Sequence, residues 1–163
     1  MEFYFDSIDL ALLQQLQQDA SLSNLDLARK VHVSPPTCLR RVKRLHQAGL
    51  IERQVAILDP QRLAQHTGQV LSALVEVTLD RQSAEAMDAF EARAVADNEV
   101  QQCWRVSPGP DFMLVTCTRD MPGYLALAQR LFTQDANVRN VRAFFAVKRA
   151  KFDTRLPLPA PVR

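Results

Sequence analysis

The segment from Val31 to Gly49, VHVSPPTCLRRVKRLHQAG, constrains the fold most, because its start, its end and both of its faces are defined. Ser34 is a good N-cap, and Pro35 suits the first helical position, where its missing N–H is not needed. Gly49 can end the helix in the left-handed conformation that favours glycine. Apolar side chains recur at helical spacing along one side: Cys38, Val42 and Leu45. The sequence therefore predicts one short helix with an apolar stripe.

The other face of this helix is basic, since no acid falls between Arg29 and Gln47. A charge run alone is typical of a solvated surface helix. The alternative is a helix that lies in the DNA major groove and contacts bases through its N-terminal part. The residues predicted to contact DNA on this helix are Ser34, Pro36, Thr37, Arg40, Arg41, Lys43 and Arg44. The elements on either side decide between the two interpretations.

Two more helices are predicted before the basic one. Residues 6–18 carry apolar side chains at helical spacing, and Asp6 can cap them. Ser23, with Asp26 three residues later, forms a variant of the capping box at the start of the next helix. Three short helices of which the last is basic are typical of a helix-turn-helix, and this arrangement favours the DNA-binding interpretation.

After Gly49, which ends the basic helix, the apolar residues no longer follow helical spacing. Residues 50–51 and 55–58 are apolar and flank a short polar turn, so they suggest two short strands. A small β-wing at this place gives a winged helix. Arg53 lies in the predicted wing and could contact a phosphate, although an exposed arginine in a turn needs no such role.

The second half of the chain alternates between strand and helix patterns. Alternation is clearest in residues 70–79, where one face is predicted to hold Ala73, Val75, Val77 and Leu79. The predicted strands are 70–79, 100–106, 112–118 and 138–148, and the predicted helices are 83–97 and 121–134. This βαββαβ order is that of a ferredoxin-like domain. The predicted fold class is therefore α+β, a winged helix-turn-helix followed by a ferredoxin-like domain.

The predicted sheet has one face that no helix covers. Leu74 and Phe144 lie on that face with few charges, and an apolar patch of this kind usually marks an interface. We therefore expect a homodimer. A two-fold dimer that carries two winged helices would bind double-stranded DNA at a palindromic operator, with half-sites about 34 Å or a multiple of that distance apart.

The polar segment between the two patterns is interpreted as a linker, and whether residues 61–65 form a short helix stays open. The proline-rich end, LPLPAPVR, is predicted to be an extended or disordered tail. The predicted organisation is a DNA-binding domain at 1–59, a linker at 60–69, a dimerisation and effector domain at 70–152 and a tail at 153–163.

Composition excludes several other classes. The net charge of +2 is near zero, so a DNA-binding chain must concentrate its positive charge locally. No apolar run approaches the roughly 20 residues that span a bilayer, and the N-terminus lacks the basic start of a secretory signal. Three scattered cysteines fit neither a disulfide scaffold nor a zinc site, so we expect a reducing cytoplasm. The three histidines do not cluster, which argues against an enzyme, and no cofactor or metal is expected.

Several stretches together resemble the Lrp/AsnC family of bacterial and archaeal transcription regulators, also called feast/famine regulators. They are IDLALLQQLQQDASLSNLDLARKVHVSP, CLRRVKRLHQAGLI, AILDP and VSPGPDFMLV. The resemblance runs from about Phe5 to Phe152. It implies a dimer that can assemble further into tetramers or octamers, and regulation by a small effector, usually an amino acid, bound between subunits.

Two positions depart from the family pattern. His32 stands where the turn before the basic helix usually has a small residue such as glycine, and we interpret it as a surface substitution. The resemblance also implies an effector site in the loop that follows residue 106, although its glycine comes one position late and two prolines remove N–H donors. Asp111 could hold an effector's ammonium group, and the loop N–H groups its carboxylate. The implied effector residues are Ser107, Pro108, Gly109, Asp111 and Phe112.

Three alternatives stay open at this point. The first is an architectural DNA-binding protein whose loop has lost its ligand. The second is an enzyme like the siroheme decarboxylases, which are similar in layout, but no histidine follows His66 to bind a porphyrin. The third concerns Cys103 and Cys117, which a symmetric hairpin would set opposite each other as a redox pair. For these two thiols we favour the reading of small buried side chains.

Overall fold

The computed structural model describes residues 5–68 and 70–159, and the chain forms two compact units. The first unit ends at Ile57 and also includes the chain from Lys151 onwards, whereas the second runs from Leu58 to Ala150. No helix in the described ranges is both long enough and apolar enough to cross a membrane.

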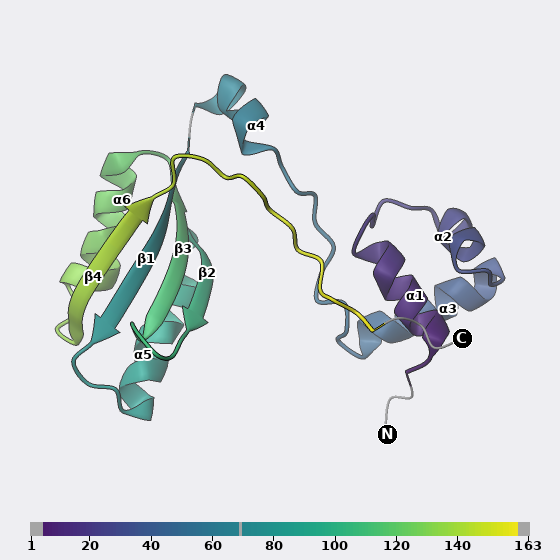
Figure 1. Cartoon of the computed structure of the whole chain (residues 1–163), viewed down its shortest axis with the longest axis horizontal. Coiled ribbons are helices and arrows are strands. Elements are labelled where there is room, and N and C mark those ends of the chain that lie inside the picture. The colour runs from purple at the N-terminus through teal and green to yellow at the C-terminus, as the bar shows by residue number, and fades with distance from the viewer. Residues whose placement is uncertain (1–4, 69, 160–163) are drawn as a thin grey trace. The chain divides into compact units, whose positions relative to one another are not determined.

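Helices α1 (Ser7–Leu16), α2 (Asn24–Lys30) and α3 (Pro35–Gln47) form the first unit (Figure 1). Asp6 caps α1 through Oδ1, which accepts from the N–H groups of Ile8 and Asp9 at 3.0 Å each. Ser23 caps α2 by accepting from the N–H of Asp26. Both predicted N-caps are confirmed, but the capping-box variant predicted at Ser23 is wrong, because the Asp26 carboxylate accepts from the Ser23 hydroxyl and not from its backbone N–H. The side chains buried between the helices are Leu12, Leu27, Ala28, Cys38 and Leu45.

The two ends of α3 differ in how well the sequence predicted them. Gly49 has φ 70°, and the N–H of Leu50 reaches the carbonyl of Leu45, so the predicted glycine stop is confirmed. The predicted side-chain cap by Ser34 is wrong, because its hydroxyl donates to Thr37 Oγ1 at 2.9 Å instead. Pro36 has no N–H, so one of the two donors from which an N-cap side chain can accept is missing at the start of α3.

The turn between α2 and α3 places His32 in the left-handed region, with φ 57°. The next N–H, that of Val33, bonds to the carbonyl of Ala28 at 3.0 Å, which is the bond that closes a helix end of this type. A residue with a Cβ carries strain in this conformation. The constraint on this position is therefore the left-handed backbone conformation of the turn, and not a contact of the imidazole ring.

The prediction of two wing strands is wrong for this single chain. Residues 50–58 form no strand, and the apolar side chains of Val55, Ile57 and Leu58 are exposed. A strand needs a hydrogen-bonding partner, and none of the described segments pairs with this one. Directly afterwards Asp59 caps a helix, α4 (Pro60–Thr67), which answers the question that the sequence left open for the linker.

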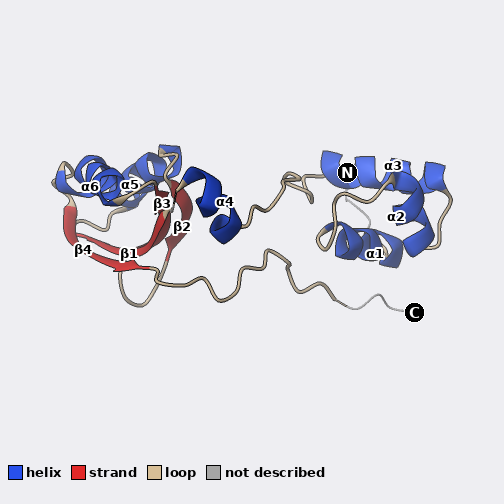
Figure 2. Ribbon diagram, turned by 90° about the horizontal axis from the view of Figure 1, so that it is seen from above, coloured by secondary structure: helices blue, strands red, loops and turns tan. Residues whose placement is uncertain are grey.

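The second unit is a four-stranded antiparallel sheet in the order β2-β3-β1-β4. Its elements are β1 (Leu71–Leu79), α5 (Ala84–Ala96), β2 (Val100–Arg105), β3 (Phe112–Thr118), α6 (Met121–Ala128), the π-helical turn η1 (Gln129–Thr133) and β4 (Val138–Phe145). Helices α5 and α6 cover the same face of the sheet (Figure 2). The predicted βαββαβ order and the α+β class are confirmed.

The core of this unit lies between the sheet and the two helices. The four β1 side chains predicted on one face are all at most 1% exposed. Phe90 of α5 packs against Phe112 of β3 with ring centroids 4.8 Å apart. On the opposite face, Leu74 and Phe144 sit side by side and are 45% and 46% exposed. That face is therefore open in the single chain.

The predicted opposition of Cys103 and Cys117 is wrong. The hairpin is not centred on Pro110: Arg105 pairs with Phe112 and Trp104 with Met113, so Cys103 lies opposite Leu114. Cys117 lies opposite Ser72 of β1, whose hydroxyl is 3.9 Å from its sulfur. The two thiols are partly buried and do not face each other.

The segment after β4 returns to the first unit. Residues 151–159 form neither helix nor strand. The side-chain amide of Gln17, just after α1, bonds to both backbone groups of Leu156. Its Nε2 donates to the carbonyl at 3.1 Å, and its Oε1 accepts from the N–H at 2.9 Å. At least this part of the C-terminal segment therefore has a fixed partner.

Candidate nucleic-acid interface and effector loop

Helix α3 has an exposed basic face. Arg40 and Lys43 are exposed, and with Pro36 they follow one another at helical spacing, so they lie on one side. Within residues 5–68 and 70–159, neither of these cations has an ion-pair partner. Both are therefore available to a negatively charged ligand such as a DNA phosphate or a base edge.

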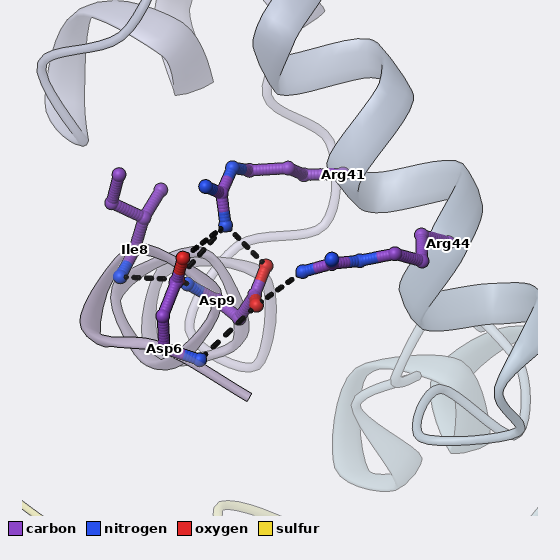
Figure 3. A network of polar contacts seen from close by, with 5 residues as sticks. All are labelled: Asp6, Ile8, Asp9, Arg41 and Arg44. Carbon is purple, nitrogen blue, oxygen red and sulfur yellow. Dashed lines mark hydrogen bonds and ion pairs between the residues drawn. The ribbon is translucent and has the colours of Figure 1, made fainter. Parts of the chain in front are cut away.

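Arg41 does not belong to this face, which corrects the prediction that it lies on the outer side of α3. Its side chain is 18% exposed and points to α1, where Nη1 lies 2.8 Å from Asp6 and 3.0 Å from Asp9 (Figure 3). Arg44 also turns to α1, with Nη2 2.5 Å from Asp9 Oδ2, but remains 43% exposed. Two of the predicted DNA-contacting arginines thus bind acids of the same unit.

Asp9 is the centre of this contact, and its side chain is fully buried. It occupies the third position of α1, where its carboxylate accepts from the N–H of Asp6 and completes a capping box. Burying a carboxylate is costly unless it is paired, and here two guanidinium groups pair with it. The sequence analysis missed this role. The signal was a matched spacing: Asp6, the N-cap of α1, and Asp9 are three residues apart, as Arg41 and Arg44 are on α3.

The surroundings of Asp6 and Arg41 favour the charged form of both side chains. Burial alone would raise the pKa of Asp6, but the Asp9 N–H, the Arg41 guanidinium and the Ile8 N–H together hold that pKa below its usual value. The hydrogen bond to Asp6, helped by Asp9, raises the pKa of Arg41. The Nε of Arg41 is buried and has no hydrogen-bond partner among the described residues. The cluster therefore fixes α3 against α1 through charge, with one donor unsatisfied.

The remaining predicted contacts lie at the start of α3 and after its end. Ser34 and Pro36 are exposed, and Thr37 is half-buried. Arg53 is exposed in the segment that forms no wing strand, with Nε 3.8 Å from the carboxylate of Glu52. Of these four residues, Ser34 and Thr37 are joined by the hydrogen bond between their hydroxyl groups.

The predicted effector residues separate into two groups. Ser107, Pro108 and Gly109 are exposed at the tip of the β2–β3 connection. Asp111 is only 8% exposed, and its Oδ2 accepts from the N–H of Leu79 at 2.7 Å. Phe112 is fully buried in the core. Three of the five residues are thus exposed at the tip, and the other two are buried at its base.

The backbone explains the inward position of Asp111. Its N–H donates to the carbonyl of Val77, and its carbonyl accepts from the N–H of Val106. Together with the side-chain bond to Leu79, these contacts join the hairpin to the end of β1. In this chain the carboxylate stabilises the base of the loop, while the tip stays open to solvent.

A helix-turn-helix with a basic second helix, joined to a ferredoxin-like domain, defines a two-domain DNA-binding protein. Residues 5–52 match the family model for winged helix-turn-helix DNA-binding, and residues 72–156 match the Lrp/AsnC ligand binding domain. The chain belongs to the Lrp/AsnC family, and it is a DNA-binding transcriptional regulator of that type with a ligand-binding domain.

Relatives and solved structures agree over nearly the whole chain. The leucine-responsive regulatory protein of Escherichia coli K12 is 32% identical, over 93% of this chain and 90% of its own length. An uncharacterised regulator of the helix-turn-helix type from Haemophilus influenzae is 33% identical, over 94% and 89%. An AsnC family regulator from Agrobacterium tumefaciens has a TM-score of 0.81 at 30% identity, covering 94% and 97%. A Neisseria meningitidis regulator in complex with L-methionine has a TM-score of 0.80 at 28% identity, with the same coverage.

Proposed function

We propose that this regulator binds specific DNA sequences through the exposed face of α3. The observation that carries the proposal is that Arg40 and Lys43 are exposed without an ion-pair partner in the described chain, while Arg41 is held against α1. Arginine can bond bidentately to guanine, and lysine can neutralise a phosphate. The proposed contacts are Ser34, Pro36, Thr37, Arg40, Lys43, Arg44 and Arg53, and Arg41 is given the role of fixing the helix.

The proposal extends to a two-fold dimer that binds a palindromic operator. The support is the open sheet face, on which Val115, Leu74 and Phe144 form one row across three strands. A second copy would remove this apolar surface from water. In this arrangement residues 1–59 contact DNA, the linker at 60–69 connects them to the dimerisation and effector domain at 70–152, and the tail at 153–163 follows.

For the effector we propose an amino acid bound at the β2–β3 loop. The exposed tip at Ser107, Pro108 and Gly109 supports this site, as does the match to a ligand-binding domain. Because Asp111 is engaged with Leu79, we assign it to the support of the loop, so that a second subunit would supply the partner of the ammonium group.

The DNA proposal is tested by recovering genomic fragments with the full chain, sequencing them, and measuring affinity by fluorescence anisotropy. Arg40→Ala should weaken binding to a recovered fragment by about 1–3 kcal/mol if the side chain contacts a base. Arg119→Ala, which changes an exposed arginine in the second unit, serves as the control. Unchanged affinity after replacement of both Arg40 and Lys43 would disprove the assignment of α3.

The effector proposal is tested by thermal unfolding with a panel of amino acids. A ligand that binds only the folded chain raises the unfolding temperature with concentration. A stabilising amino acid whose effect is lost in Ser107→Ala would support the loop. If no member of the panel stabilises the chain and fragments are bound without sequence preference, the architectural DNA-binding alternative is favoured.

A further inference from the structure

A cavity of about 250 Å³ opens between α6–η1 and β4 in the second unit, and it shares no lining residue with the loop at 107–112. Its apolar wall is formed mainly by Ala128, Phe132 and Val141. Ligand sites for drug-sized molecules are usually about 300–1,000 Å³, so this cavity suits only a small molecule. Its apolar wall suits a short hydrocarbon chain.

Tyr124 lines this cavity with a hydroxyl that has no protein partner. The residue is 7% exposed, and its ring packs edge-on against Phe145 with centroids 4.9 Å apart. Within residues 5–68 and 70–159 the Tyr124 hydroxyl forms no hydrogen bond. The hydroxyl is not one of the buried polar atoms that lack a partner in the described chain, so it is accessible from the cavity and available as a donor. Burial also raises the pKa of Tyr124, so the group remains a neutral donor at physiological pH.

The charge contributed by the residues that line the cavity is positive. Arg139 contributes a guanidinium, and no aspartate or glutamate belongs to the lining. The nearest acid to that guanidinium is Asp80, whose Oδ1 is 3.9 Å from Nε, beyond hydrogen-bond distance. A carboxylate would therefore find two donors among the lining residues, whereas no lining residue offers a carboxylate to an ammonium group.

The wall includes a π-helical turn. Phe132 and Thr133 come from η1, which continues α6 with one wider turn. Such turns are rare, and they occur frequently at functional sites because they displace side chains from the α-helical positions. The same turn also supplies Leu131 and Phe132 to the apolar core, so it connects the core with the cavity wall.

We propose that this cavity binds a small monocarboxylate with a short apolar chain and no ammonium group. The Tyr124 hydroxyl and the Arg139 guanidinium bind the carboxylate, and the apolar wall holds the chain. This ligand class differs from the amino acid proposed for the β2–β3 loop. The inference does not depend on DNA binding, so the regulator would have a second, independent ligand input.

The test is isothermal titration calorimetry of the full chain with 4-methylpentanoate and with L-leucine, which has the same carbon skeleton plus an ammonium group. The carboxylate should bind at least about tenfold more tightly than the amino acid to this cavity. Tyr124→Phe removes only the hydroxyl and should weaken binding about five- to tenfold, the value of one hydrogen bond. Arg139→Gln should weaken it further, whereas the matched control Arg119→Gln should not change it.

Ala128→Leu supplies a steric variant that removes no polar group and extends into the cavity. It should abolish binding of 4-methylpentanoate, while circular dichroism and the fluorescence of Trp104 verify that each variant is folded. No binding by the unmodified chain would overturn the proposal. So would binding that persists in Ala128→Leu, or binding that is lost in Ser107→Ala instead, because the carboxylate would then occupy the loop.

Discussion

The two units of the chain are stabilised in different ways. The sheet unit has a continuous apolar core in which both α5 and α6 pack on one face. Its buried polar side chains, such as Asp111 and Thr116, bond to backbone groups of β1. The helical unit has a smaller apolar core and adds a fully buried carboxylate, Asp9, that binds two arginines of α3. Apolar packing thus determines the sheet unit, whereas charge pairing helps to orient the helix proposed to contact DNA.

The largest effect should follow from a change in the apolar core. Phe90→Ala removes a fully buried ring that contacts Phe112, and such truncations destabilise by about 3–5 kcal/mol. The chain has one tryptophan, Trp104, which lies in the sheet unit, so its fluorescence during urea unfolding measures this loss. Val95→Ala, which truncates an exposed side chain of the same helix, should change stability by less than about 0.5 kcal/mol.

A change in the charge cluster should affect the other unit. Asp9→Asn removes the buried charge that pairs with Arg41 and Arg44 and leaves Arg41 with Asp6 alone, and breaking a buried pair costs about 3 kcal/mol or more. Circular dichroism should show an earlier helical transition, while the Trp104 transition stays in place. Glu52→Gln neutralises an exposed acid of the same unit and is the control. Equal shifts of both transitions would contradict the separation of the two units.

The two faces of α3 should differ in salt dependence. Lys43→Gln should reduce the slope of log affinity for DNA against log salt by about 0.9, because one phosphate contact is lost. Arg41→Gln should leave that slope unchanged and instead lower the stability of the helical unit. The measurement is anisotropy over a salt series at a temperature where both variants are folded. A reduced slope in Arg41→Gln would place that arginine on the DNA.

The smallest predicted effect concerns pH. The pKa of Asp6 is lowered in the folded state, so its stabilisation is present above its unfolded pKa of about 3.9 and is lost as pH falls through the folded value. Asp6→Asn should therefore be less stable than the unmodified chain at pH 7, by under about 1 kcal/mol for this part-exposed group. The difference should shrink below pH 4. A constant difference between pH 7 and pH 3 would assign the effect to capping geometry.

The spacing of apolar residues and the residues that cap or end helices were enough to predict most of the fold. The alternation in β1 identified the four side chains that face the helices, and Gly49 marked the end of α3. The wing strands could not be predicted correctly, because strand pairing depends on a partner that residues 50–58 do not have in this chain. The side-chain cap at Ser34 was wrong for a local reason, since Pro36 lacks one of the two possible donors and the Ser34 hydroxyl bonds to the Thr37 side chain instead.

The candidate sites were harder to predict than the fold. A helical wheel separates the apolar stripe of α3 from the rest, but it does not show that α1 lies close enough to bind Arg41 at the edge of that stripe. Asp111 presents the same difficulty, because its position in the sequence suggests a loop while its bonds to β1 bury it. Both residues are oriented by segments about 30 residues away along the chain. Contacts between segments so far apart along the chain produce no periodic pattern of residues in the sequence.

The returning C-terminal segment has a practical consequence for protein engineering. Because Leu156 is bonded to Gln17 and the chain from Lys151 belongs to the helical unit, the ferredoxin-like fold is in effect an insertion within the DNA-binding unit. A stop codon placed after β4 would therefore trim the DNA-binding half of the protein, although it lies at the far end of the gene. For the same reason, the two halves of this regulator cannot be separated by one cut in the linker.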